Sequence, residues 1–212
     1  MIDNSQADRR ILDGEVDFTM MYVAHDAFTR HLEWLVSAIE QGRVAGPGTS
    51  ARWALFKKQL HIHHTAEDSS LWPRLRTAVV QADEAAVLDA MELEHAQLDP
   101  QLDRVDAALL RGAAAEGAAN LRDLIAGLGA HMRHEENEAL PLVERHLGPA
   151  GWDAFGKNIR KTQGLRGASV YFPWLLDGTD AATAAKLLGV LPPPLRFLYR
   201  RLWAPKYRKA FG

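Results

Sequence analysis

The sequence contains no cysteine among its 212 residues. This absence excludes disulfides, iron–sulfur clusters and thiolate zinc sites, so a metal site in this chain must use nitrogen and oxygen ligands. Long apolar runs are also missing. No stretch approaches the ~20 apolar residues that cross a bilayer, and the N-terminus has no apolar run of signal-peptide length. We therefore expect a cytoplasmic protein without a transmembrane segment.

The small net charge of -2 conceals two oppositely charged parts. Residues 1–148 carry 14 Lys and Arg against 24 Asp and Glu, whereas residues 149–212 carry 11 against 3. A basic tail can bind nucleic acid or anionic lipid. We favour the alternative that the basic part packs on the acidic part, and we expect no nucleic-acid partner.

One motif occurs twice, as HHTAEDSSLWP over residues 63–73 and as HMRHEENEALP over residues 131–141. Each copy has a His ten residues before a Pro, a Glu four residues after that His, and an acidic residue directly after the Glu. Positions i and i+4 share one face of a helix, so each copy directs an imidazole and a carboxylate the same way. Two further histidines, His25 and His95, precede the copies by 38 and 36 residues. The pattern indicates a duplicated pair of helices.

Apolar residues recur at steps of three and four in four successive segments, which is typical of helices in a bundle. Glycine-containing turns follow the first and third segments near Gly42 and Gly112, and Gly148 closes the fourth. The sequence therefore predicts an all-α fold, an up-down-up-down four-helix bundle over residues 15–148. We expect residues 149–212 to form a basic helical C-terminal extension packed on the bundle.

Each predicted helix carries a histidine at a position where a core residue belongs, and two helices add a glutamate. A single such histidine is more often a hydrogen-bonded core residue than a ligand, but unpaired buried carboxylates would be costly. We therefore favour a metal site built from His25, His63, Glu67, His95, His131 and Glu135. His31, His61 and His64 point away from these faces, so we predict that His31 is a surface residue and that His61 and His64 are exposed or only support the ligands.

These residues resemble the hemerythrin-like, or HHE cation-binding, family over about residues 15–147. The resemblance rests on His25-Asp26, on Glu94-His95 and on the two His-x-x-x-Glu-acid motifs that end in an apolar residue and Pro. It implies a non-haem di-iron centre bridged by two carboxylates and an oxo or hydroxo oxygen, in proteins that bind dioxygen, handle peroxide or nitric oxide, or sense iron or oxygen. It also implies that the six residues named above are the iron ligands.

The chain departs from the oxygen-carrying members at one position. Those proteins have a second histidine four residues along the third helix, whereas this chain has Met91 and Asp99. Two coordination positions are then open to water or an external ligand, unless one is filled from a set of nearby side chains: Tyr22, Glu92, Glu136 or Glu138. A more open centre favours chemistry with peroxide or nitric oxide, or redox stress, over reversible oxygen carriage.

Three classes of function remain open at this stage. The first is binding of dioxygen or nitric oxide at two iron ions, and the second is an enzyme that decomposes peroxide, as a catalase or peroxidase does. The third is an iron or oxygen sensor, or a regulatory interaction module, that uses the basic C-terminal extension. The extension also has Phe197, Leu202 and Trp203 beside several Arg and Lys residues, so peripheral membrane contact is a further possibility.

Overall fold

The structure, a computed structural model, describes residue 12 and residues 14–44 and 46–211, and every regular element in these ranges is helical. The α-helices are α1 (Thr19–Glu40), α2 (Pro47–Ala66), α3 (Trp72–Ala78), α4 (Ala82–Leu110), α5 (Ala114–His134), α6 (Leu140–His146), α7 (Gly148–Leu176), α8 (Ala181–Leu188), α9 (Pro193–Leu198) and α10 (Ala204–Phe211). Three π-helical turns join some of them: η2 (Glu67–Leu71), η3 (Glu135–Ala139) and η4 (Tyr199–Trp203).

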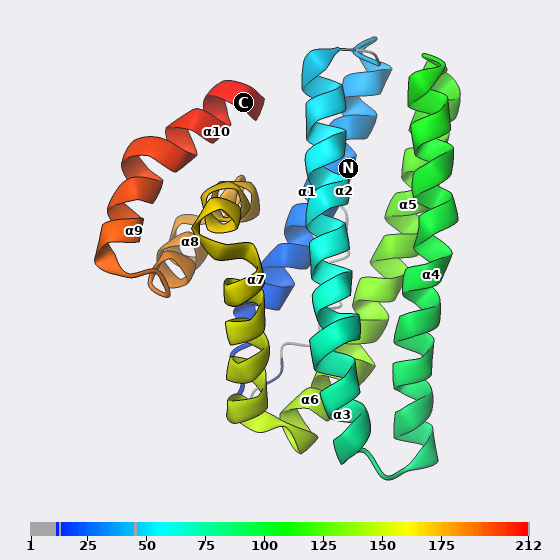
Figure 1. The fold of residues 1–212 in the computed structure, drawn as a ribbon. Helices are drawn as coiled ribbons and strands as arrows, with labels where there is room; N and C mark the ends of the chain where they lie inside the picture. The colour runs from blue at the N-terminus through cyan, green and yellow to red at the C-terminus, as the bar shows by residue number, and fades with distance from the viewer. Residues whose placement is uncertain (1–11, 13, 45, 212) are drawn as a thin grey trace.

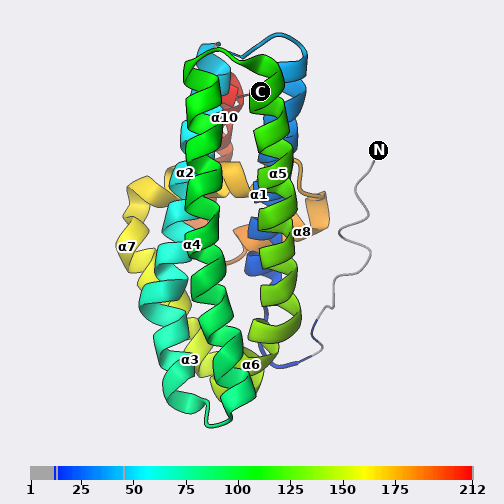
Figure 2. The same cartoon turned by 90° about the vertical axis from the view of Figure 1, so that its right-hand side faces the viewer.

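Four long rods form the bundle (Figures 1 and 2). They are α1, the continuous α2–η2–α3, α4, and the continuous α5–η3–α6, and successive rods run in opposite directions. Helix α1 packs against α2 and α5, and α5 packs against α4. The predicted up-down-up-down bundle is confirmed. Gly42 and Gly112 adopt φ values of 81° and 67° where the chain reverses at the end of α1 and α4, a conformation that glycine adopts without steric cost.

The two π-helical turns η2 and η3 begin at the glutamates of the duplicated motif. A proline inside a helix usually ends or kinks it. The structure instead keeps the rod helical, with Pro73 and Pro141 just after the widened turns, in the first turns of α3 and α6. Proline has no N–H to donate and its ring collides with the carbonyl four residues earlier, so a wider turn relieves both problems. The turns also lie where the interior carries Glu67 and Glu135.

Two apolar clusters fill the interior at different heights. One packs Phe28, Leu32, Phe56, Leu60, Leu98, Val105, Leu124 and Leu128, and the other packs Met21, Leu71, Trp72, Leu75, Leu88, Met91, Leu140 and Val143. Along each rod, the histidines of the sequence pattern fall between the residues of the first cluster and those of the second. The bundle thus holds one polar layer between two apolar ones.

The C-terminal helices lie together on one side of the bundle (Figure 1). Helix α7 bends at Gly164, which adopts φ 58°, and it contacts α1, α2 and η2. Near its C-terminal end Trp174 is fully buried, with its ring 5.0 Å from that of Phe28 on α1. Arg30 donates hydrogen bonds to the carbonyls of Leu175 and Asp177, at 3.0 and 2.9 Å. These bonds satisfy carbonyls that the end of a helix leaves unpaired.

The prediction that His31 is a surface residue was wrong. Its exposed fraction is 1%, because the C-terminal helices cover this part of α1. The His31 ring lies 5.4 Å from that of Trp174, and its Nε2 is 3.3 Å from the Tyr207 hydroxyl. Burial, and then the charges of Arg52 and Arg30, lower the pKa of His31 to about 3.

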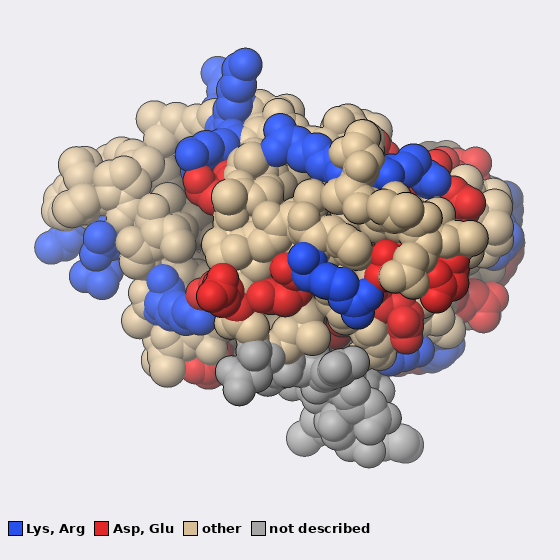
Figure 3. Space-filling model, turned by 90° about the horizontal axis from the view of Figure 1, so that it is seen from below, with Lys and Arg blue, Asp and Glu red and all other residues tan. Residues whose placement is uncertain are grey.

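Basic and acidic side chains are interspersed on the face seen from below (Figure 3). Within the described ranges, no helix is both long enough and apolar enough to span a membrane.

Candidate metal centre

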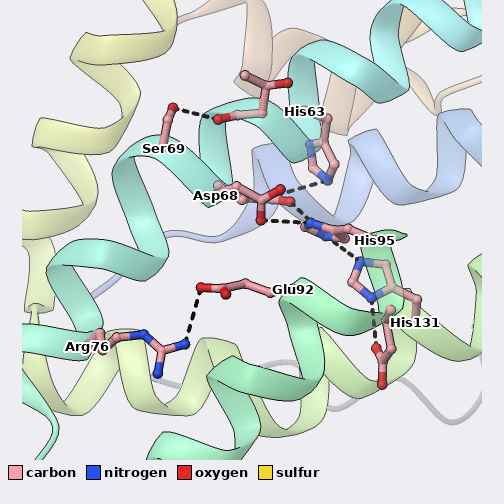
Figure 4. Close-up of polar contacts among 10 residues, drawn as sticks. His63, Asp68, Ser69, Arg76, Glu92, His95 and His131 are labelled. Carbon is pink, nitrogen blue, oxygen red and sulfur yellow. Dashed lines mark hydrogen bonds and ion pairs between the residues drawn. The ribbon is translucent and has the colours of Figure 1, made fainter. Parts of the chain in front are cut away.

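The polar layer receives one histidine from α1, one from α4, two from α2 and one from α5. Figure 4 shows His63, His95 and His131 directed toward one another between the helices. Two glutamates, Glu67 and Glu135, come from the first positions of the π-helical turns, and both are fully buried. The duplicated motif therefore places its imidazoles and carboxylates in one shared interior, as the sequence predicted.

The first group of potential ligands consists of His25, His63 and Glu135, with one atom of each within 4.8 Å of the others. The Nε2 atom of His25 lies 3.1 Å from Glu135 Oε2. The rings of His25 and His63 meet edge to face at 5.3 Å. We call this group the first cluster.

The second cluster consists of His64, His95 and His131, again with one atom of each within 4.8 Å of the others. The His64 ring stacks on that of His95 at 3.9 Å, and the Nε2 atoms of His95 and His131 are 3.1 Å apart. His64 was not among the predicted ligands, and the structure brings it into the layer. Successive residues on α2 differ in direction by about 100°, and α2 stands at a corner of the bundle, so His63 and His64 both reach the interior from its two flanks.

Glu67 lies between the two clusters. One carboxylate oxygen is 3.1 Å from His63 Nε2, and the other is 3.6 Å from His95 Nε2. A carboxylate that faces a ligand of each cluster with a different oxygen has the geometry of a bridge between two cations.

Acidic side chains hold the outer nitrogens of the histidines. Asp68 accepts from His95 Nδ1 at 2.8 Å, and Glu136 accepts from His25 Nδ1 at 2.7 Å. Glu94 bonds His131 Nδ1 at 2.9 Å and, with its other oxygen, His134 Nδ1 at 2.7 Å. A carboxylate on Nδ1 fixes the tautomer in which Nε2 is free to accept a cation. The acidic residue after each Glu of the motif therefore has a role that its position alone did not reveal.

A comparison with protein families matches residues 16–143 to the Hemerythrin HHE cation binding domain. The chain belongs to the hemerythrin HHE family. The matched residues run from α1 into α6 and include every residue of the polar layer. No match is found among curated proteins or among solved structures.

The ionisable groups of this hemerythrin-like centre are poorly stabilised by protein contacts alone. Burial, reinforced by the neighbouring histidines, lowers the pKa of His63 and His64 well below the usual value. Burial and the charge of Glu135 raise the pKa of Glu67 well above its usual value. At His25, burial lowers the pKa, but Glu135 and Glu136 overcome that effect and raise it to about 9. A cation in the layer would favour ionised carboxylates and neutral imidazoles together.

The layer also holds buried polar atoms that make no hydrogen bond. They are both carboxylate oxygens of Glu67 and of Glu135, together with Nε2 of His25 and of His64. Some of them lie at ion-pair distance, since His25 Nε2 is 3.1 Å from Glu135 and His63 Nε2 is 3.1 Å from Glu67, so protein contacts satisfy the set only in part, and a buried polar atom left without a partner costs about 1–3 kcal/mol. Because these atoms are of the types that ligate cations and converge on one volume, the residues present fit a metal centre. The HHE domain binds cations, and these His and Glu clusters are able to hold metal.

Other residues considered from the sequence lie outside the layer. Glu92 pairs with Arg76 at 3.2 Å on the surface (Figure 4), and Glu138 and His61 are exposed. Tyr171 of α7 is a neighbour that the sequence did not indicate. Burial and the charge of Glu67 raise its pKa.

Proposed function

We propose that this hemerythrin-like chain holds two iron ions in the polar layer and binds a small oxidant there, namely dioxygen, peroxide or nitric oxide, in the handling of oxidative or nitrosative stress. The observation that carries the proposal is the set of buried, unbonded carboxylate oxygens of Glu67 and Glu135 among histidine nitrogens. Imidazole and carboxylate ligands suit iron, manganese or zinc, and the family resemblance favours iron.

The two clusters suggest how the ligands divide. His25, His63 and Glu135 would hold one iron, and His64, His95 and His131 the other, with Glu67 shared. We infer that Glu135 is also shared, since its charge acts on His131 as well as on His25. With His64 included, five histidines and two shared carboxylates would leave one coordination position open to an external ligand, rather than two. His64 would thus take the place of the histidine that the third helix lacks.

Bound iron would supply the redox chemistry and the affinity for a diatomic or peroxide ligand. The chain's own residues would prepare the site for it. Asp68 and Glu136 hold His95 and His25 so that their Nε2 atoms face inward. The two apolar clusters above and below the layer exclude bulk water and so strengthen the electrostatic interactions within it.

The first test is elemental analysis of freshly purified protein together with its absorption spectrum. We expect two irons per chain and absorption bands in the near-ultraviolet and visible range that change when azide, peroxide or nitric oxide is added. One metal per chain, or zinc after growth in iron-rich medium, would contradict the proposal. Evolution of gas from hydrogen peroxide by the iron-loaded protein would assign the chain to the peroxide-decomposing enzymes.

A second candidate function, an iron or oxygen sensor, is favoured by one observation. Trp174 of α7 packs on Phe28 at 5.0 Å, and the Phe28 ring lies 5.2 Å from that of His63. If His63 moved when the iron state changed, the movement would therefore reach Trp174 and the C-terminal helices through the Phe28 side chain alone. Tryptophan emission that changes when the iron is reduced, without turnover of peroxide, would favour the sensor.

A further inference from the structure

A cavity of about 1080 Å³ lies between α1, α7 and α8, and its lining includes His63 of the first cluster. Side chains from all three helices, together with Leu191 just after α8, make most of the lining apolar; those from the helices include Met20, Ala24, Ala168, Phe172 and Leu187. The bend at Gly164, which itself lines the cavity, redirects α7 along this side.

The volume of the cavity is much larger than a diatomic ligand needs. A water molecule takes up ~30 Å³ in the liquid, and dioxygen, nitric oxide and hydrogen peroxide are of comparable size. Cavities that bind organic molecules occupy roughly 300–1,000 Å³ and are mainly apolar, with a few polar groups that fix orientation. This cavity resembles those that bind organic molecules, both in its volume and in its mainly apolar lining.

The mouth of the cavity indicates the polarity of its ligand. Leu165 and Val190 line it and are 57% and 61% exposed, which is unusual for large apolar side chains. The two cations in the lining are already engaged: Lys186 pairs with Asp17 at 2.8 Å, and Arg160 pairs with Asp153 at 3.4 Å. The lining thus favours a neutral molecule over an anionic one.

The inner end of the cavity is the polar one. His63 has a side-chain exposure of 13%, compared with 0–6% for Glu67, Glu135, His25, His95 and His131. Tyr171 lines the cavity as well, near enough to Glu67 to feel its charge. A molecule that fills the cavity would therefore bring its inner end to the metal layer.

We propose that the cavity binds a neutral, elongated organic molecule with an apolar body and one polar end group, and that the polar end lies at His63 beside the metal centre. The apolar body would lie along α7 and α8, where it replaces water on Ala168, Phe172 and Leu191. The part of this inference that concerns contact with iron rests on the proposed function. The binding of the apolar body does not, because helices α1, α7 and α8 form its site.

The test uses the full-length, iron-loaded protein and the neutral fluorescent probe N-phenyl-1-naphthylamine, whose emission rises in apolar surroundings. We expect saturable binding that 1-decanol reverses by competition. Ala168→Trp would fill the cavity and raise the Kd of the probe about tenfold or more. The matched control is Ala185→Trp, which adds the same ring at an exposed position on α8 outside the lining, and which should bind the probe as the unmodified chain does.

A second variant guards against misfolding of Ala168→Trp, which circular dichroism would reveal. Val190→Asp places a charge at the exposed mouth and should weaken probe binding several-fold with the fold intact. Equal binding by all variants would overturn the proposal, as would a dimer that dissociates on adding probe, because the apolar mouth would then be an interface between copies of the chain.

Contact with the metal centre is read separately from the iron absorption bands, which 1-decanol should shift in the unmodified chain but not in Ala168→Trp. Reversible probe binding in a chain that lacks two irons would retain the cavity as a site and reject the proposed function. Two irons per chain without probe binding would support the proposed function and reject the cavity as a binding site.

Discussion

The metal centre has two halves that correspond residue by residue. His25 and His63 on α1 and α2 match His95 and His131 on α4 and α5, and the two motif glutamates match each other. In both halves the acid after the Glu reaches the histidine of the other helix pair, with Asp68 on His95 and Glu136 on His25. The shared parts are those that would hold the cations.

The halves differ in what surrounds this shared set. Beside His131 stand Glu94 and His134, and the Glu94 carboxylate accepts hydrogen bonds from both His131 and His134. The equivalent positions beside His63 are Ala24 and Ala66, and Ala24 lines the large cavity. The half around His131 is thus closed by a polar network, while the half around His63 is open to an apolar space. Duplication accounts for the candidate metal ligands, and the departures from it give the two halves different surroundings.

The largest effect should come from the two glutamates. Glu67→Gln removes the carboxylate that lies between the clusters, so we expect iron affinity to fall by more than about 100-fold at both positions. Glu135→Gln should weaken iron binding at both positions as well, and more strongly in the first cluster, because Glu135 lies within 4.8 Å of its histidines. Elemental analysis and calorimetric titration measure the iron content and affinity of both variants. Full retention of both irons by either variant would contradict our inference that its glutamate is shared.

The next test concerns His64, which has Met132 as its counterpart in the other half. His64→Gln removes a nitrogen from the second cluster and should lower the iron content from two toward one per chain, with a changed spectrum. His61→Gln is the control, because His61 is exposed on the same helix. If the two variants behaved alike, His64 would not be a ligand.

Much of the fold could be read from the sequence, because it depends on periodic apolar patterns and on turns. Steps of three and four predicted the four rods, and Gly42 and Gly112 predicted two of the three reversals between them. The π-helical turns could not be predicted in the same way. Their cause is a conflict between proline and the preceding carbonyls, and the sequence does not show whether that conflict ends the helix, kinks it or widens a turn.

The six predicted ligand residues converge in one layer, and the i, i+4 spacing explains why. The sequence pattern did not predict the place of His64, because a helical wheel assigns one inward direction to a helix that touches two neighbours. It missed the burial of His31 for a different reason. The covering side chains, Trp174 and Tyr207, are more than 140 residues away along the chain, and no local pattern reports a contact of that range.

Smaller effects are expected from the acids that orient the histidines. Asp68→Asn and Glu136→Gln should each weaken iron binding by about 10–100-fold. Glu136→Gln should have the greater effect, since the Glu136 side chain is 4% exposed and that of Asp68 is 41% exposed, where water can replace it. The rate of iron loss to a chelator measures both. Asp99→Asn, exposed on α4, should lose iron as slowly as the unmodified chain, and equal rates for all three variants would contradict an orienting role.

The smallest effect concerns His31, on the side of the bundle that the C-terminal helices cover. In the unfolded chain its pKa is near 6.5, and in the folded chain burial lowers the pKa to about 3. Between these values the unfolded chain binds a proton that the folded chain does not. The free energy of unfolding therefore falls as the pH drops below 6.5, by at most about 1.4 kcal/mol per pH unit.

His31→Gln should remove this dependence. Between pH 7 and pH 5 the unmodified chain should lose about 2 kcal/mol more stability than the variant, measured by urea unfolding of the metal-free protein so that protons do not compete with iron. Tyr207→Phe provides the matched control: it removes the hydroxyl 3.3 Å from His31 Nε2, at a cost of about 1 kcal/mol, but leaves the titrating ring buried. It should therefore keep the full pH dependence. The same acid sensitivity in His31→Gln as in the unmodified chain would show that the C-terminal helices do not keep this histidine neutral.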